Sequence, residues 1–176
     1  MRHRIRALRF LIGTVAVSIA LSLVCLAQTA AGGNAAPAQV APLKDYPTNR
    51  IEILVREWTR ARDYTKEYLD AMPEGGTGLK PTPEIRSFAE QMLHLAAGNY
   101  ALVSRAIGIT NPIQGKNPEQ MDEYKTKAAL TKFVTESYDF VIASVKAVSD
   151  SKLDEKIPTA GLNRPRWAAL AAAFEH

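Results

Sequence analysis

Apolar side chains recur every three or four residues in four separate stretches of this chain, the spacing that gathers them on one face of a helix. The clearest stretch predicts a helix over residues 82–107. Thr82 is the expected N-cap, and Pro83 suits the first helical position, where its missing N–H would be unpaired anyway. Glu84 lies near the positive end of the helix dipole, and Gly108 is expected to end the helix. The predicted buried stripe comprises Ile85, Phe88, Met92, Leu95, Ala96, Asn99, Leu102, Val103 and Ala106.

A helix is also predicted over residues 49–72, where Asn49 and Glu52 have the spacing of a capping box. Its apolar stripe comprises Ile51, Leu54, Val55, Trp58, Ala61, Thr65, Tyr68, Leu69 and Met72. The opposite face is charged and is expected to be solvated: Arg56, Arg60, Asp63, Lys66, Glu67 and Asp70. Three aromatic side chains could line a pocket, although core packing is the favoured interpretation: Trp58, Tyr64 and Tyr68.

Two further helices complete the pattern. One is predicted over residues 123–149, with a stripe of Leu130, Val134, Ser137, Val141, Ser144, Val145 and Val148. The other opens near Asn163 with Pro165 close to its first position, and its apolar face consists of Trp167, Leu170, Ala171 and Phe174. It stops at His176 after barely three turns, without a C-cap, so we expect it to fray.

The fold class predicted from these stretches is all-α, a four-helix bundle whose fourth helix is short and incomplete. No segment of any length alternates as a strand does, and the intervening stretches are rich in Gly, Pro and Asn. Because these loops are about ten residues long, neighbouring helices can be parallel or antiparallel, and the topology stays open. A short fourth helix would also leave a groove over the other three, which leaves a homodimer open.

The formal charge of +4 arises from the beginning of the chain, because residues 1–30 hold Arg2, Arg4, Arg6 and Arg9 and no acid. Without these four, basic and acidic residues are equal in number. The charge therefore gives no reason to expect nucleic acid or an anionic membrane surface as a partner.

Residues 1–30 have the layout of a signal peptide, since the cationic start is followed by the apolar run FLIGTVAVSIALSLVCLA. Cleavage is expected after Ala27, with Ala30 and Ala31 as alternatives; an uncleaved signal anchor would keep a membrane contact through this leader alone. Either way the chain is expected to be exported, periplasmic or secreted. Loss of Cys25 would exclude disulfides, thiolate catalysis and Cys-type zinc sites. Residues 31–47 are expected to form a flexible linker, and residues 48–176 the folded domain.

Two imidazoles remain after the leader, His94 beside the stripe of the 82–107 helix and His176 in the last helix. A bundle can bring these two helices together, and bundle interiors often hold metal ligands. The plainer interpretation of His94 is a half-buried side chain at a helix seam. Catalytic zinc sites commonly use three protein ligands, so Glu90 and Glu175 are the carboxylates that could complete a set. No catalytic residue can be assigned from the pattern.

A family resemblance rests on five segments in order: residues 62–73, 80–88, 91–96, 130–141 and 174–176. Together they resemble the DinB-like family of four-helix metalloenzymes, particularly its exported members, over residues 49–176. The resemblance implies a divalent metal, zinc or nickel, held by three histidines. His94 matches the ligand of the second helix, and His176 matches the first of two in the last helix; the other would fall four residues later.

What the resemblance implies for function is a metal-dependent enzyme acting on an unknown small molecule, with a metal-activated water or thiol as the reactive group. A thiol cosubstrate fits poorly with an oxidising exported compartment. With one of the three histidines not matched, the alternative is a non-catalytic helical binding or structural module, or a gene fragment that has lost metal binding.

Overall fold

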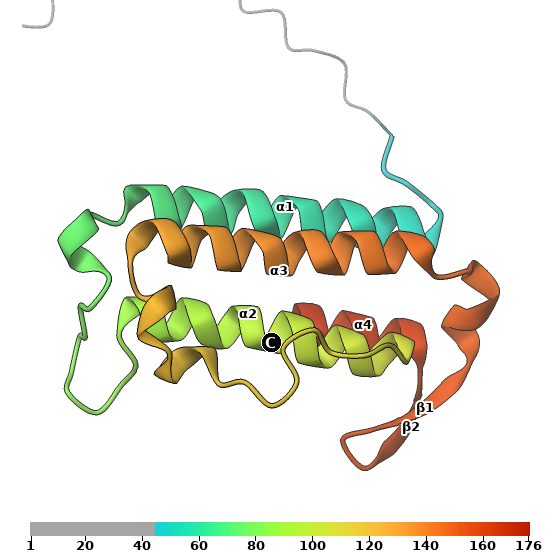
Figure 1. Cartoon of the computed structure of the whole chain (residues 1–176). Helices are drawn as coiled ribbons and strands as arrows, with labels where there is room; N and C mark the ends of the chain where they lie inside the picture. Colours follow the sequence, from blue (N-terminus) through green and yellow to red (C-terminus); the bar gives the residue numbers. More distant parts are fainter. Residues whose placement is uncertain (1–44) are drawn as a thin grey trace, which may run out of the picture. The chain divides into compact units, whose positions relative to one another are not determined.

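The computed structural model describes residues 45–176, and this part of the chain forms a four-helix bundle (Figure 1). The helices are α1 (Arg50–Ala71), α2 (Phe88–Ile107), α3 (Lys127–Ala147) and α4 (Arg166–Phe174). The predicted all-α fold is confirmed. The signal peptide and most of the linker predicted from the sequence lie outside the described residues. Within residues 45–176, no helix is both long and apolar enough to traverse a bilayer.

The bundle has two layers, with α1 beside α3 in one and α2 beside α4 in the other (Figure 1). Its core lies where α2 and α3 face each other, and the fully buried side chains there and around it include Leu69, Leu93, Val103, Leu130, Val134, Val141, Val145 and Leu170. Each such side chain contributes about 1.5–3 kcal/mol through burial. Inside this core the Asn99 Nδ2 donates to Ser137 Oγ over 3.0 Å, so the polar pair is satisfied without water.

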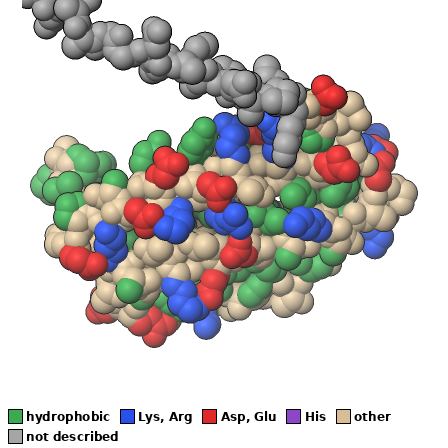
Figure 2. Space-filling model, turned by 90° about the horizontal axis from the view of Figure 1, so that it is seen from above, with side chains coloured by type: hydrophobic (Ala, Val, Ile, Leu, Met, Phe, Trp, Pro, Cys, Tyr) green, Lys and Arg blue, Asp and Glu red, His purple; other side chains and the backbone are tan. Residues whose placement is uncertain are grey.

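The predicted charged face of α1 is exposed as expected. Figure 2 looks onto the α1 side of the domain and shows basic and acidic side chains interspersed there. Lys66 Nζ lies 2.6 Å from Asp70 Oδ2, one turn apart on the helix. Such exposed pairs contribute little to stability and leave no single-sign patch on this face.

The start of α1 agrees with the sequence prediction, because the Asn49 side chain accepts hydrogen bonds from the backbone N–H groups of Ile51 and Glu52. The predicted start of α2 at Thr82 is wrong, and the helix begins at Phe88. Ser87 is the N-cap, and its reciprocal capping box with Glu90 satisfies two amides at once, more than Thr82 could. Ile85 is consequently off the helix and 47% exposed.

The backbone before α2 reinforces this start. Phe88 N donates to the carbonyl of Leu79 over 3.0 Å, and Ala89 N donates to that of Thr77 over 2.8 Å. The connecting loop thus supplies acceptors for the first amides of α2, which would otherwise lack intrahelical partners.

The predicted bounds of the last two helices also need correction. Helix α3 begins at Lys127 behind the N-cap Thr126, because two short 3-10 turns, Pro118–Gln120 and Asp122–Tyr124, occupy the preceding residues. The start of α4 lies at Arg166 rather than near Asn163. Helix α4 buries Ala169, Leu170 and Ala173, whereas Trp167, predicted on its apolar face, is 43% exposed. Tyr68 of the predicted α1 stripe is also exposed, at 67%.

A small antiparallel hairpin, which the sequence pattern did not predict, precedes α4. Strand β1 (Lys156–Thr159) pairs with β2 (Leu162–Pro165), and Thr159 lies opposite Leu162. The two residues between them, Ala160 and Gly161, have φ angles of +51° and +76°. Positive φ at both central positions is what the type I′ turn, a common two-residue hairpin turn, requires.

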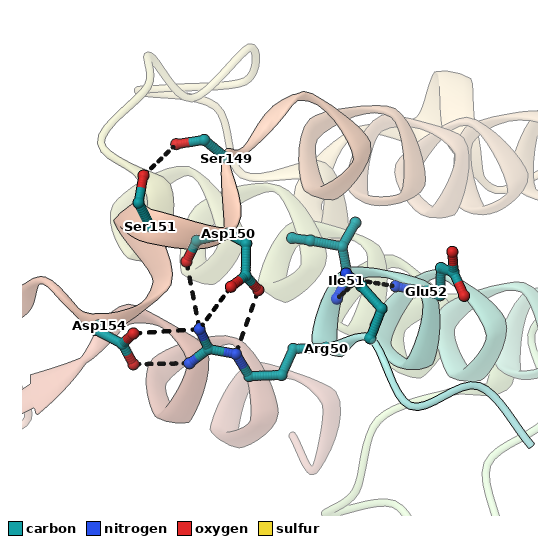
Figure 3. A network of polar contacts seen from close by, with 8 residues as sticks. Arg50, Ile51, Glu52, Ser149, Asp150, Ser151 and Asp154 are labelled. Atoms are coloured by element: carbon teal, nitrogen blue, oxygen red, sulfur yellow. Dashed lines mark hydrogen bonds and ion pairs between the residues drawn. The ribbon is translucent and has the colours of Figure 1, made fainter.

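A cluster of charged side chains joins the start of α1 to the 3-10 turn Asp150–Asp154 that leads into the hairpin (Figure 3). Arg50 Nη1 donates to Asp154 Oδ1 over 2.7 Å, and Nη2 donates to Asp150 Oδ2 over 3.0 Å. Hydrogen bonding to Arg50 lowers the pKa of Asp154. Leu153, fully buried in the same turn, anchors it to the core. These contacts fix the route of the chain from α3 to α4.

Candidate functional site

The rings of His94 and His176 lie against each other, with centroids 5.3 Å apart and planes inclined by 52°. His94 projects from the middle of α2, where its side chain is 34% exposed, and His176 follows the end of α4. The packing of α4 against α2 therefore brings together the two imidazoles singled out in the sequence.

Gly98, one turn after His94 on α2, leaves room for the imidazole of His176. A Cβ atom at this position would lie 2.6 Å from Cδ2 and 2.9 Å from Nε2 of His176. Any larger residue would occupy the space of the ring, so His176 rests directly on bare helix backbone.

The end of α4 is held by two contacts. Phe174 meets the Trp58 ring edge-on with centroids 5.3 Å apart, which links the end of α4 to α1. The amide of Glu175 continues the helix by donating to the carbonyl of Ala171 over 3.2 Å. Aromatic pairs in this arrangement contribute about 0.5–1.5 kcal/mol beyond area burial, enough to orient the residues next to them.

A carboxylate that the sequence reasoning did not single out contacts His94. The Nδ1 of His94 lies 2.7 Å from Glu119 Oε1, and Arg86 Nε donates to Glu119 Oε2 over 2.6 Å. Partial burial works against ionisation, but the hydrogen bonds from Arg86 and His94 outweigh it and lower the pKa of Glu119. An ionised Glu119 accepts a hydrogen bond from the N–H at Nδ1, which leaves the lone pair on Nε2 of His94 available.

Glu119 reaches His94 because of the residue before it. Pro118 is fully buried and begins the 3-10 turn Pro118–Gln120, which packs on α2. Glu119 is 25 residues from His94 in the chain, and no local periodicity links them. The only local signal was an Asn-Pro pair before a carboxylate, which is typical of many turns.

Neither of the two carboxylates suggested from sequence is grouped with the two histidines as a third ligand. Glu90 Oε2 accepts from the backbone N–H of Ser87 over 2.7 Å and lies 3.2 Å from Lys80 Nζ. Hydrogen bonds from the Ser87 backbone and side chain, and then from Lys80, lower the pKa of Glu90 to about 2. Glu175 is exposed after α4. Among residues 45–176, no three His, Cys, Asp or Glu side chains are grouped so that they could hold a metal ion.

The described domain is thus a four-helix bundle with a histidine from its second helix beside one that follows its fourth. The sequence pattern of the DinB superfamily matches residues 57–176, and the chain belongs to this superfamily. No curated protein sequence matches the chain significantly.

Proposed function

We propose that this DinB-superfamily protein binds a divalent metal ion, zinc or nickel, through His94 and His176. The observation that carries the proposal is the 5.3 Å separation of the two ring centroids. Neutral imidazole is a ligand that suits both metals. The contact of Glu119 with Nδ1 of His94 adds support, because histidines that bind metals commonly donate their other ring N–H to a carboxylate.

The donor set within residues 45–176 fits such an ion in part, since it offers two of the three protein ligands that catalytic zinc sites commonly use. We therefore expect weak affinity. When bound, the ion would polarise an oxygen or sulfur atom of a small-molecule substrate. The protein's own part is to keep the proton on Nδ1 of His94, through a Glu119 that Arg86 holds ionised, and to keep the histidines open to solvent.

A non-catalytic helical binding module is the second candidate. The absence of a grouped third ligand among the described residues favours it, because two imidazoles alone hold a metal weakly. The two candidates differ in whether metal affinity depends on the histidine pair and its carboxylate.

Removing the carboxylate tests the metal proposal. Glu119→Gln keeps the shape of the side chain but loses the charge that orients His94, and we expect zinc affinity to fall about tenfold. The measurement is titration calorimetry of the purified protein with Zn²⁺ and Ni²⁺, with His94→Ala as the variant that lacks a ligand. Glu136→Gln is the matched control, because Glu136 pairs with Lys132 on the surface of α3 and should leave affinity unchanged. Equal metal affinity in Glu119→Gln, His94→Ala and the parent protein would rule the proposal out.

We also propose that the protein is exported, on the strength of the four arginines and the apolar run in residues 1–30. Expressed from its full coding sequence, it should be recovered outside the cytoplasm with an N-terminus between Gln28 and Gly32. N-terminal sequencing after fractionation checks this. A soluble cytosolic protein that still begins at Met1 would contradict it.

A further inference from the structure

A pocket of about 270 Å³ opens beside His176, between the C-terminal half of α2, the hairpin and α4. One wall is apolar and built from short side chains, among them Ala106, Ala169 and Ala173. The remaining wall is polar and includes Arg105 from α2 and Arg164 from β2. The pocket therefore joins a small apolar surface to a basic edge next to the histidine pair.

The two arginines differ from the other arginines in the described part of the chain. Five of those others form ion pairs with carboxylates: Arg50, Arg60, Arg62, Arg86 and Arg166. Arg56 lies over the Tyr46 ring, 4.6 Å from its centroid. Within residues 45–176, no ion pair within 4.0 Å involves Arg105 or Arg164. Two arginines without an ion pair thus line one pocket.

A third polar group at the pocket also lacks a partner. The hydroxyl of Thr159, at the end of β1, is buried and makes no hydrogen bond among the described residues. The hydroxyl oxygen itself is shielded from solvent, so it is a polar group without a partner behind the pocket wall rather than a direct contact for a ligand.

One acid, Glu175, also lines the pocket and must be weighed against the arginines. It forms no ion pair with either of them among the described residues, and the two arginines outnumber this single lining carboxylate. Guanidinium groups present paired N–H donors that match the two oxygens of a carboxylate or phosphate.

We propose that this pocket binds a small organic anion, with its carboxylate or phosphate facing Arg105 and Arg164 and a short apolar body against the alanines. The inference rests on the proposed function, because the bound molecule would lie beside His176, and it specifies the class of small molecule that the site takes. A neutral molecule of the same size would leave both guanidinium groups without partners.

The test uses four probes on metal-free and zinc-loaded protein: butanoate, butyl phosphate, butanol and inorganic phosphate. Titration followed by two-dimensional amide NMR should show butanoate or butyl phosphate binding at least about fivefold more tightly than butanol or phosphate alone. The tighter of the two anions identifies the head group. Equal binding of butanol and the two anions, or no binding of either anion, would overturn the inference.

Substitutions assign the recognition to the arginines. Arg105→Gln and Arg164→Gln should each weaken anion binding at least about fivefold, while Arg164→Lys, which keeps the charge but loses the paired donors, should have an intermediate effect. Arg56→Gln on α1 is the matched control and should change nothing. Anion binding that persists in both glutamine variants would overturn the inference, and a variant with a lowered melting temperature is replaced by its lysine counterpart.

The two proposals fail separately. The arginine variants should keep zinc affinity within about twofold of the parent, and His94→Ala should keep anion binding to the metal-free protein. If His94→Ala binds zinc as tightly as the parent, the metal proposal is refuted and the anion result is unaffected. If the arginine variants bind the anion as tightly as the parent, the present inference is refuted and the metal result is unaffected.

Discussion

Leu170→Ala is expected to destabilise the protein by about 2–5 kcal/mol, the range for truncating a buried leucine. Leu170 is 0% exposed and is the largest fully buried side chain of α4, which packs mainly on α2. Its removal leaves a cavity between α2 and α4, the two helices that position His94 and His176. Urea unfolding followed by circular dichroism gives the free energy of unfolding directly.

Trp167→Ala on the same helix is the matched comparison. Because Trp167 is 43% exposed, its loss should cost less than about 1 kcal/mol although the side chain is larger. The sequence pattern, with its short last stretch, instead predicts a frayed fourth helix, in which neither substitution would matter much. A Leu170→Ala cost below about 1 kcal/mol would favour fraying, and weak protection of the α4 amides from exchange would support the same conclusion.

The positions of the helices could be predicted from the sequence because burial imposes a period, and periods are visible without coordinates. The residues at which the helices begin were harder to predict. Thr82 and Ser87 are both acceptable N-caps by residue type, and the difference lies in Glu90, which completes a capping box with Ser87, and in the loop carbonyls of Thr77 and Leu79. The hydrogen bonds to these loop carbonyls depend on how the loop folds back on the helix, which no local pattern reveals.

The hairpin was missed for a different reason. Both of its strands contain proline, Pro158 and Pro165, and both are largely exposed, so the alternation that marks a strand is weak. Ala160 occupies a turn position at positive φ, where Gly, Asn or Asp is usual, so the turn signal was weak as well. A segment of this kind is held by its neighbours, here the buried Leu153 before it and α4 after it.

The residues of the candidate site were likewise predictable only in part. His94 and His176 could be named from sequence because imidazoles are few and their helices were predictable. Glu119 could not, because it lies in a turn that packs back onto α2 from 25 residues away. Arg86 could not either, because it contacts Glu119 and not His94. Residue type alone favoured Glu90, which lies one turn from His94, but the start of α2 engages that carboxylate instead.

Gly98→Ala separates the site from the fold, because the two are expected to respond in opposite directions. Alanine is more favourable than glycine inside a helix by about 1 kcal/mol, so the free energy of unfolding should stay level or rise. The new Cβ would lie 2.6 Å from Cδ2 of His176, so the ring must leave its place beside His94. His176 is exposed, and its displacement should cost little.

Zinc affinity of Gly98→Ala is therefore expected to fall about a hundredfold, toward the upper end of what losing the support of a metal ligand costs. Titration calorimetry and urea unfolding of the same preparation measure both quantities. Gly75→Ala is the control, since a Cβ there meets nothing within 4 Å and zinc affinity should not change. If Gly98→Ala binds zinc as tightly as the parent, His176 does not act as a ligand from the position it holds against α2, and His94 with Glu119 would have to bind the ion without it.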